Sequence, residues 1–501
     1  MAWAITGRST GSKGMSVNEM PNAEVSCAPA DSGRHLQGNL GVIGLLLTYL
    51  AGLAPLVGMG TYVPVVVGLG VGTAAPLVYV GMLFIALALA SGVVGMARHM
   101  VRPGALYTYI TAGLGRIAGL AGGLGALTTY ILYAATSYMM VAIMGQPLIT
   151  ALHGPSLPWW VWSLIAWIGV SILTLLNIDV STRVLGFLLC LEVIAVLLWE
   201  VRVMANGGPD GRGLNIATGP HGGESIGVAM IFAVSVLTGF EVLQVFRNET
   251  PNPERAIPRA TYLSVSLVAA FYTVGAYVYL VAFGADAAVA SVADPANNYI
   301  ASVATYAGVV VGDIAKVLMV TSALAAQLTY QNVAARYAFA FANDRVLPSW
   351  FAAVHPRFRA PTRSAALVAG TVLILDTIVV VLQIDVLAAF VTLAALAGFL
   401  MMVLYLAVSI AVFFYFRRNP ELERSTWKTK VAPAISTVGF LVIVVAATIN
   451  RATMTGGDET VATWCLVVIA FMLAAYAAYA LWLSTHRPKT WALVAEEATQ
   501  T

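Results

Sequence analysis

The segment LGVIGLLLTYLAGLAPLVGMGTYV, residues 40–63, is the most informative part of this chain about its architecture. It carries no charged side chain and is long enough to cross the hydrocarbon core of a bilayer, which takes about 20 helical residues. Gly52, Pro55, Gly58 and Gly60 interrupt its middle and second half. Such residues leave backbone groups unpaired in lipid unless protein or a cavity pairs them. The stretch therefore predicts a membrane helix that is broken near its midpoint, inside the protein.

The composition extends this prediction to the whole chain. Its 501 residues are 59% hydrophobic and 10% charged, whereas a soluble domain is about 45–50% apolar and about 25% charged. A soluble enzyme, a nucleic-acid binder and a disordered scaffold are thereby excluded as the main interpretation. The net charge of +3 is too small to imply an anionic partner. Three cysteines without a close pair predict neither a disulfide framework nor a zinc site, and we expect no cofactor or metal.

Twelve apolar runs predict an all-α integral membrane protein with 12 transmembrane helices, because only helices and closed barrels satisfy their backbones in lipid. The runs are 40–63, 74–97, 117–144, 158–176, 184–204, 226–246, 262–283, 309–341, 365–382, 386–416, 432–449 and 461–483. Most of the 26 lysines and arginines fall in the tails and in alternate loops. This bias predicts a cell-membrane protein whose N-terminal tail (1–39) and C-terminal tail (484–501) are both cytoplasmic.

A second interruption, Thr238-Gly239, lies in run 226–246, five spans after the first. Two five-helix segments, 40–204 and 226–416, then have opposite topology and matching breaks. This pattern predicts a 5+5 inverted repeat with a binding site at the bilayer midplane, followed by two C-terminal helices within 432–483. The alternative is that glycine and proline are simply commoner in membrane helices than in soluble ones.

Three motifs lie along these segments in order. RPGALYTY (102–109) resembles "PGG-x-Y-x-Y", and ANDRVLP (342–348) resembles "A-x-DG-x-LP". TGFE (238–241), followed by ETPNP (249–253) and IPRA (257–260), resembles "GFE … E-x-x-NP-x-x-x-IP-x-A". All three patterns belong to the amino acid, polyamine and organocation superfamily of permeases. The resemblance implies the leucine-transporter fold and alternating access for a small amine-bearing substrate.

The resemblance also implies where substrate binds. The carboxylate is expected on backbone amides of the first broken span and the ammonium on carbonyls of the sixth, since half-helix ends favour such charges. A tyrosine ring of the eighth span suits a cationic amine, although such a side chain is also a common core residue. The expected substrate contacts are Pro55, Gly58, Met59, Gly60, Ser235, Thr238, Gly239 and Tyr330. The first break departs from the family's usual Gly-x-Gly pattern, which keeps polyamines and other amines without a carboxylate as an alternative.

Glu192 is the first ionisable residue at depth, nine residues into span 184–204. Such a residue is a functional hypothesis by default, and a carboxyl group there could exchange a proton each time the site changes sides. It could instead bind Na⁺, but the corresponding part of the eighth span, Ala325-Ala326-Gln327, carries no hydroxyl group. We therefore favour protons over Na⁺, with Glu192 and Gln327 as coupling residues. The alternative is a structural hydrogen bond to a neighbouring helix, for example to Gln327.

The other ionisable residues at depth have competing roles. Glu241, directly after the second break, is either a gate beside the substrate or a side chain that pairs freed backbone N–H groups. Asp313 and Lys316 have the i,i+3 spacing of a salt bridge on one helical face. Asp376, alone in the ninth span, is expected to make an interhelical hydrogen bond or an oligomer contact.

These observations predict a secondary active transporter that moves an amino acid across the cell membrane, with proton coupling. Its expected partners are the amino acid or amine substrate, protons and membrane lipids, with no nucleic acid. An intramembrane enzyme is not expected, because all six histidines fall in loops or tails and no HExxH or GxxxxGK[ST] motif occurs. A polyamine transporter, an amino acid/amine exchanger and a non-transporting sensor or scaffold stay as alternatives.

Overall fold

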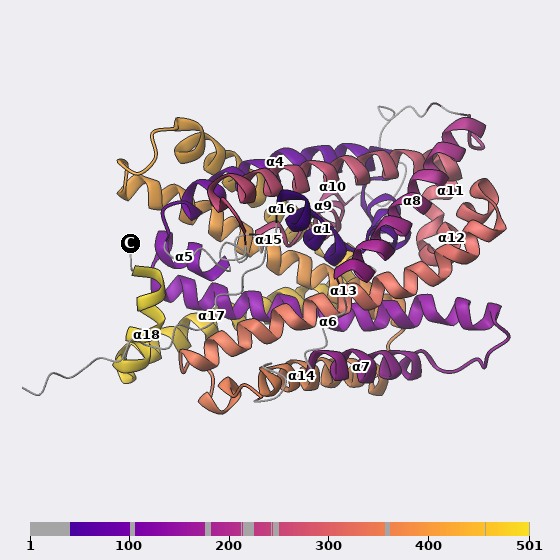
Figure 1. Cartoon of the computed structure of the whole chain (residues 1–501). Coiled ribbons are helices and arrows are strands. Elements are labelled where there is room, and N and C mark those ends of the chain that lie inside the picture. The colour runs from indigo at the N-terminus through magenta and orange to yellow at the C-terminus, as the bar shows by residue number, and fades with distance from the viewer. Residues whose placement is uncertain are drawn as a thin grey trace, which may run out of the picture. The chain divides into compact units, whose positions relative to one another are not determined.

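In the structure, a computed structural model, the described part of the chain consists of helices joined by turns and short irregular segments (Figure 1). That part comprises residues 41–100, 106–175, 182–211, 213, 225–241, 243, 250–355, 361–455 and 457–499. Within it, the one β feature is an isolated bridge between Gly208 and Gly211. The predicted tail 1–39, the motif residues 102–105 and Glu249 lie outside the described residues.

The first half of the chain contains a broken helix followed by four long apolar elements. Its elements are α1 (Val42–Leu53), α2 (Pro55–Val57), η1 (Gly58–Tyr62), α3 (Val63–Val65), η2 (Val66–Val71), η3 (Gly72–Ala74), α4 (Ala75–Ala97), α5 (Leu106–Leu114), α6 (Arg116–Ala151), α7 (Trp159–Leu175) and α8 (Thr182–Asn206). The broken helix continues through π-helical turns as far as Val71, eight residues beyond the predicted end at Val63. The short helix α5 precedes the predicted third span.

The second half begins with another interrupted helix. Its elements are α9 (Ile226–Ser235), α10 (Pro253–Phe283), α11 (Ala285–Ala290), η5 (Ser291–Ala293), α12 (Pro295–Ala307), α13 (Val309–Asn343), η6 (Ser349–Ala352), α14 (Thr362–Val381), α15 (Val386–Arg418), η7 (Trp427–Val431), α16 (Ala432–Ile449), η8 (Arg451–Thr455), α17 (Glu459–His486) and α18 (Pro488–Thr499). Aspartate side chains cap two of the long helices: Asp385 accepts from the N–H groups of Leu387 and Ala388, and Asp458 from that of Val461. Helices α11 and α12 were not predicted, because neither contains an apolar run of membrane length.

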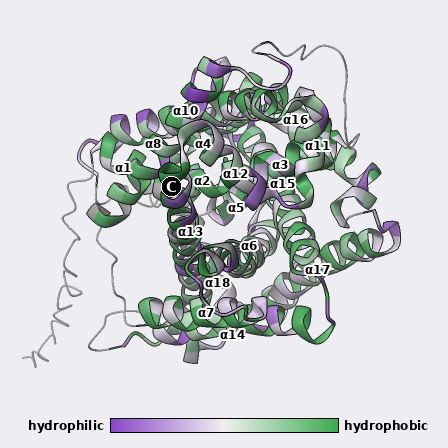
Figure 2. Ribbon diagram, turned by 90° about the vertical axis from the view of Figure 1, so that its right-hand side faces the viewer, coloured by the Kyte–Doolittle hydropathy of each residue, from purple (hydrophilic) through white to green (hydrophobic). Residues whose placement is uncertain are grey.

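Eight helical stretches of the described chain are long and apolar enough to cross a membrane. They are Pro55–Ala97, Arg116–Thr150, Pro253–Phe283, Val309–Asn343, Thr362–Val381, Val386–Arg418, Trp427–Ile449 and Glu459–His486, and α7 and α9 are shorter apolar helices. Large apolar side chains are exposed on their outer faces, such as Phe84 at 64% and Phe471 at 74%, and green apolar segments dominate Figure 2. The chain is therefore a multi-pass membrane protein, while the count of twelve spans stays a prediction.

The two predicted interruptions are both present. Between α1 and α2 the chain turns at Ala54, whose φ is 48° and ψ 68°. Helix α9 ends at Ser235, and Gly239 after it has a φ of 105°, a conformation that only glycine adopts readily. Helix α1 packs against α8, α10 and α13, and α9 packs against α4, α15 and α16. Both breaks are thus surrounded by long helices, as unpaired backbone groups at membrane depth require.

Candidate functional site

A small cavity lies beside the first break. It is lined by three residues around the break (Leu53, Ala54, Val57), by Tyr62, and by residues of α6 (Thr136, Ser137, Met140), α13 (Ala323, Ala326, Tyr330) and α15 (Phe390). We call it the central cavity. Its volume of about 20 Å³ accommodates little more than one water molecule, so in this conformation the cavity has no room for a larger molecule.

The central cavity is uncharged and carries hydroxyl groups and rings. The hydroxyl groups of Thr136 and Ser137 both donate to the carbonyl oxygen of Tyr133, at 2.9 and 2.8 Å. Tyr330 stacks on Tyr133 with ring centroids 5.3 Å apart, and the rings of Tyr62 and Phe390 meet edge to face at 6.1 Å. Of the eight expected substrate contacts, Tyr330 is the one among the cavity-lining residues.

The expected residues of the first break lie mainly behind the central cavity. Pro55 begins α2 and lines a different, lateral groove. Gly58 packs directly beneath the hydroxyl group of Tyr272 in α10. Met59 packs against Gly275 of α10, and Gly60 packs against the side chain of Met319 in α13. In this conformation the two glycines therefore allow close packing of the broken helix against its neighbours.

The second break is held by side-chain hydrogen bonds. The hydroxyl groups of Ser235 and Tyr133 are 3.1 Å apart, so Ser235 contacts a residue that supports the central cavity. Thr238 donates to the carbonyl oxygen of Val234 at 3.0 Å. From the first broken helix, the hydroxyl group of Tyr49 donates to the carbonyl oxygen of Leu237 at 3.0 Å. This last bond links the inner part of α1 to the backbone released by the second break.

Glu192 of α8 connects three helices at the first break. Its side chain is 4% exposed, and its Oε2 atom accepts from the hydroxyl group of Ser322 in α13 at 2.7 Å and from the backbone N–H of Leu56 at 3.4 Å. Leu56 is the second residue of α2, where backbone N–H groups lack helical partners and favour an anion. The stretch Ala325-Ala326-Gln327 carries no hydroxyl group, but Ser322, one turn earlier in α13, supplies one to Glu192 that sequence analysis did not consider.

Glu241 is saturated by donors around the second break. Its Oε2 atom accepts from the backbone N–H of Gly239 at 3.1 Å and from the hydroxyl group of Tyr405 in α15 at 2.9 Å. Its Oε1 atom accepts from the hydroxyl group of Tyr130 in α6 at 3.1 Å. The carboxyl group thus pairs backbone that the break sets free and connects it to two neighbouring helices.

Gln327 lies in a different polar group from Glu192. Its Nε2 atom donates to Oε1 of Gln331 at 3.4 Å, and the same oxygen accepts from the hydroxyl group of Tyr138 at 2.7 Å. The oxygen of Gln327 and the nitrogen of Gln331 are buried with no hydrogen-bond partner among the described residues. The hydrogen bond from Gln327 to Glu192 that we considered is replaced by the one from Ser322.

The remaining predicted charges have local partners. Lys316 and Asp313 form the expected salt bridge at 2.8 Å. Asp376 of α14 accepts from the hydroxyl group of Ser163 in α7 at 3.2 Å, which is an interhelical hydrogen bond as expected. A carboxyl group that sequence analysis did not consider, Glu200 of α8, is 6% exposed. Glu192 was singled out because an ionisable residue within a membrane span is a functional hypothesis by default. The same reasoning applies to Glu200, since both residues lie in span 184–204.

Comparisons with known proteins agree with this architecture. A family model described as "Amino acid permease" matches residues 42–491. The low-affinity putrescine importer PlaP of Escherichia coli is 25% identical over 363 residues, covering 69% of this chain and 76% of the relative. An uncharacterized transporter of Mycobacterium tuberculosis is 31% identical over 185 residues, covering 36% and 40%. The methylthioribose transporter of Bacillus subtilis is 26% identical over 246 residues, covering 49% and 50%.

One solved structure is similar over nearly its whole length. The manganese transporter of Eremococcus coleocola, in complex with an aromatic bis-isothiourea substituted compound, matches with a TM-score of 0.52 at 12% identity. The match covers 91% of this chain and 96% of that chain. At this identity the likeness shows a shared fold.

Proposed function

Because the chain belongs to the amino acid permease family, whose members are transporters and not enzymes, we propose that it is a secondary active transporter of an amino acid. It works by alternating access across the cell membrane, in a 5+5 inverted repeat formed by 40–204 and 226–416. Helices within 432–483 follow the repeat, and the tails 1–39 and 484–501 are cytoplasmic. The observation that carries the proposal is the central cavity at the break of the first helix.

The chemistry of the central cavity favours a zwitterion. Its lining contains hydroxyl groups and aromatic rings and no ionised side chain. A substrate with one positive and one negative group carries no net charge into such a site, whereas a polyamine would bring two or more uncompensated charges. The half-helix ends of the two breaks supply the partial charges for a carboxylate and an ammonium group. The expected contacts are Pro55, Gly58, Met59 and Gly60 at the first break and Ser235, Thr238 and Gly239 at the second. They reach a substrate only after the helices move, because in this conformation they lie outside the lining of the central cavity.

A polyamine is the second candidate substrate, and one contact favours it. The N–H of Leu56, at the half-helix end where a substrate carboxylate would bind, is already directed at the carboxyl group of Glu192. A substrate without a carboxylate does not compete for that N–H group. The relative PlaP, a putrescine importer, is consistent with this candidate.

We assign proton coupling to Glu192. A carboxyl group that bridges α8, the start of α2 and Ser322 of α13 changes these contacts when it gains or loses a proton. Gln327, one to two turns along α13 from Ser322, then belongs to the helix that senses this change. A carboxylate and a hydroxyl group are also oxygen ligands that suit Na⁺, so the experiment must compare both ions.

Uptake into proteoliposomes tests the proposal. Radiolabelled amino acids and putrescine are offered with an inward proton gradient, with and without Na⁺. We expect saturable accumulation of an amino acid that needs the gradient and not Na⁺. Accumulation of putrescine alone selects the second candidate, a strict Na⁺ requirement overturns proton coupling, and the absence of uptake of any amine overturns the assigned function.

A pair of variants locates the site. Ala326→Phe fills the central cavity, whereas Ala325→Phe places the same side chain on the adjacent residue, which is partly exposed and does not line the cavity. We expect Ala326→Phe to abolish uptake and substrate-induced thermal stabilisation, and Ala325→Phe to retain both. The unliganded melting temperature of each variant shows whether it is folded, and equal activity of the two variants would place the substrate elsewhere.

A further inference from the structure

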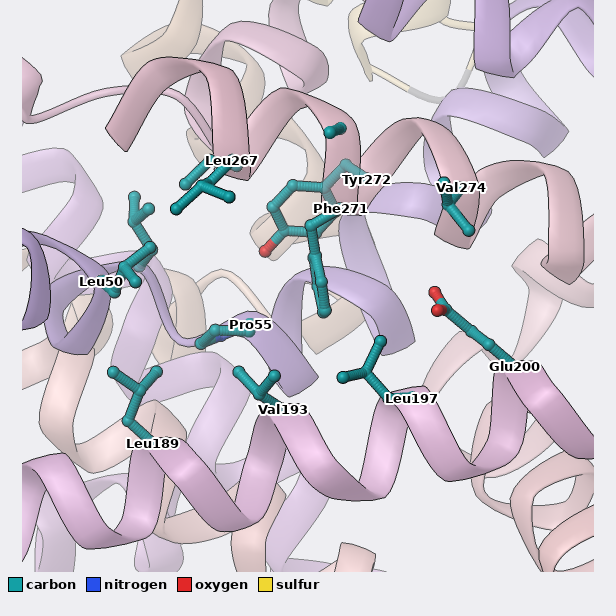
Figure 3. A pocket seen from close by; sticks show the side chains of 13 residues that line it. Leu50, Pro55, Leu189, Val193, Leu197, Glu200, Leu267, Phe271, Tyr272 and Val274 are labelled. Atoms are coloured by element: carbon teal, nitrogen blue, oxygen red, sulfur yellow. The ribbon is translucent and has the colours of Figure 1, made fainter. Parts of the chain in front are cut away.

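A lateral groove runs between α1, α8 and α10 beside the first break. Its volume is about 370 Å³, and apolar side chains of all three helices line it. Figure 3 shows Leu189, Val193, Leu197 and Glu200 along α8, facing Phe271 and Val274 of α10. Leu197, Leu267 and Val274 are 46%, 44% and 51% exposed, so the groove opens on the outer face of these membrane helices.

Glu200 is the one carboxyl group among the groove's lining residues, and one of its oxygen atoms has no hydrogen-bond partner in the part of the chain that the structure describes. Its carboxyl group points from α8 toward α10 (Figure 3). The side chain is 6% exposed, and its Oε1 atom is buried with no hydrogen-bond partner among the described residues. The atom lies against Gly275, where an added Cβ would be 3.3 Å away. Buried polar groups are nearly always paired in native proteins, so an unpaired carboxyl group at a cavity points to a ligand that donates to it.

We propose that this groove binds an amphipathic amine, with its apolar body against α8 and α10 and its ammonium group on Glu200. An ammonium group supplies both the missing donor and the opposite charge, and charge-assisted hydrogen bonds are the strong ones. A lipid acyl chain fills the apolar part equally well but leaves the carboxyl group unpaired. The ligand reaches the groove from the bilayer, through the exposed face formed by Leu197, Leu267 and Val274.

The groove is separated from the central cavity by little more than one side chain. Leu53, the last residue of α1, lines both spaces, and Pro55, just after the turn at Ala54, lines the groove. Val193, adjacent to Glu192, also lines it. A bound amine therefore packs against the residues where the first helix bends, and it opposes any motion of α1 relative to α8 and α10. The site is distinct from that of the transported substrate, and its existence does not rest on the proposed function.

Ligand binding in phosphatidylcholine nanodiscs tests the inference without any transport measurement. The probe is phenylbutylamine, and the matched probes are phenylbutanol, which has a hydroxyl group instead of the amine, and phenylbutyrate, which has a carboxylate. Thermal stabilisation as a function of probe concentration gives the apparent affinity. We expect the amine to bind the unaltered protein at least about tenfold more tightly than the alcohol, and the carboxylate more weakly than both.

Three variants distinguish the contribution of the Glu200 charge from that of the shape of the groove. Glu200→Gln keeps the size of the side chain and removes its charge, so amine and alcohol should then bind equally. Val274→Trp fills the groove and should remove binding of both, whereas Val438→Trp, at a residue of α16 that is 60% exposed, should not. The proposal is overturned if Glu200→Gln preserves the preference for the amine, if Val274→Trp leaves binding intact, or if no probe shows saturable stabilisation.

Discussion

At each of the two helix breaks, a carboxyl group accepts a hydrogen bond from a backbone N–H group, but the two carboxyl groups differ in position and in number of donors. At the second break, Glu241 follows Gly239 by two residues and accepts three hydrogen bonds, from Gly239, Tyr130 and Tyr405. At the first break, Glu192 comes from a separate helix and accepts two, one of them 3.4 Å long. A carboxyl group saturated by three donors is suited to hold a structure, and one that bridges separate helices with fewer bonds is suited to change partners. From this difference we infer a structural role for Glu241, and Glu192 stays the carboxyl group for which we propose proton coupling.

Removal of each carboxyl group should show this difference most strongly. Glu241→Leu leaves three donors unpaired in a buried site, at about 1–3 kcal/mol each, so we expect a loss of stability of about 3 kcal/mol or more. Glu192→Leu leaves two donors and should cost less. Equilibrium unfolding in mixed micelles measures both. An equal or larger loss for Glu192→Leu would remove the structural distinction between the breaks.

The backbone turns of the two breaks also differ. Gly239 has a φ of 105°, where a side chain is strained, so Gly239→Ala should lower the free energy of unfolding by about 2 kcal/mol. Ala54 already carries a Cβ at a φ of 48°. Ala54→Gly removes the backbone strain at this positive φ but increases the entropy of the unfolded chain. The two effects on the free energy of unfolding should cancel to within about 0.5 kcal/mol. A large loss of stability for Ala54→Gly would show that the methyl group, and not the turn, matters at the first break.

Transport measurements should also distinguish the roles of Glu192 and Glu241. Glu192→Gln keeps the size of the side chain but cannot exchange a proton, so accumulation driven by an inward proton gradient should fall at least about tenfold. Exchange of labelled for unlabelled substrate at equal pH should continue, because it requires no net proton movement. Glu241→Gln should still respond to the gradient. If Glu192→Gln accumulates substrate like the unaltered protein, proton coupling lies elsewhere.

Sequence reasoning located both breaks because glycine and proline at membrane depth constrain the backbone directly. It also found the Asp313–Lys316 pair, since i,i+3 spacing fixes the two side chains on one face. The lining of the central cavity was mostly missed, because the rotation of α6 that turns Thr136 and Ser137 inward depends on packing against α13 and α15. A similar limit applies to Gly58: from sequence alone, a glycine that releases backbone for substrate looks the same as one that admits Tyr272.

The smallest expected difference between the two breaks comes from removing one hydrogen-bond donor from each carboxyl group. Ser322→Ala removes the shorter of the two hydrogen bonds to Glu192 and leaves the long one from Leu56, whereas Tyr405→Phe leaves Glu241 with two good donors. A hydrogen bond to a charged group contributes about 1.5–3 kcal/mol, and less where other donors compensate. We therefore expect Ser322→Ala to lower stability by about 1 kcal/mol more than Tyr405→Phe. It should also change the pH dependence of uptake, which Tyr405→Phe should not. An unchanged pH profile in Ser322→Ala, with the stability loss present, would make Glu192 a structural carboxyl group like Glu241 and leave the proton path without an assigned residue.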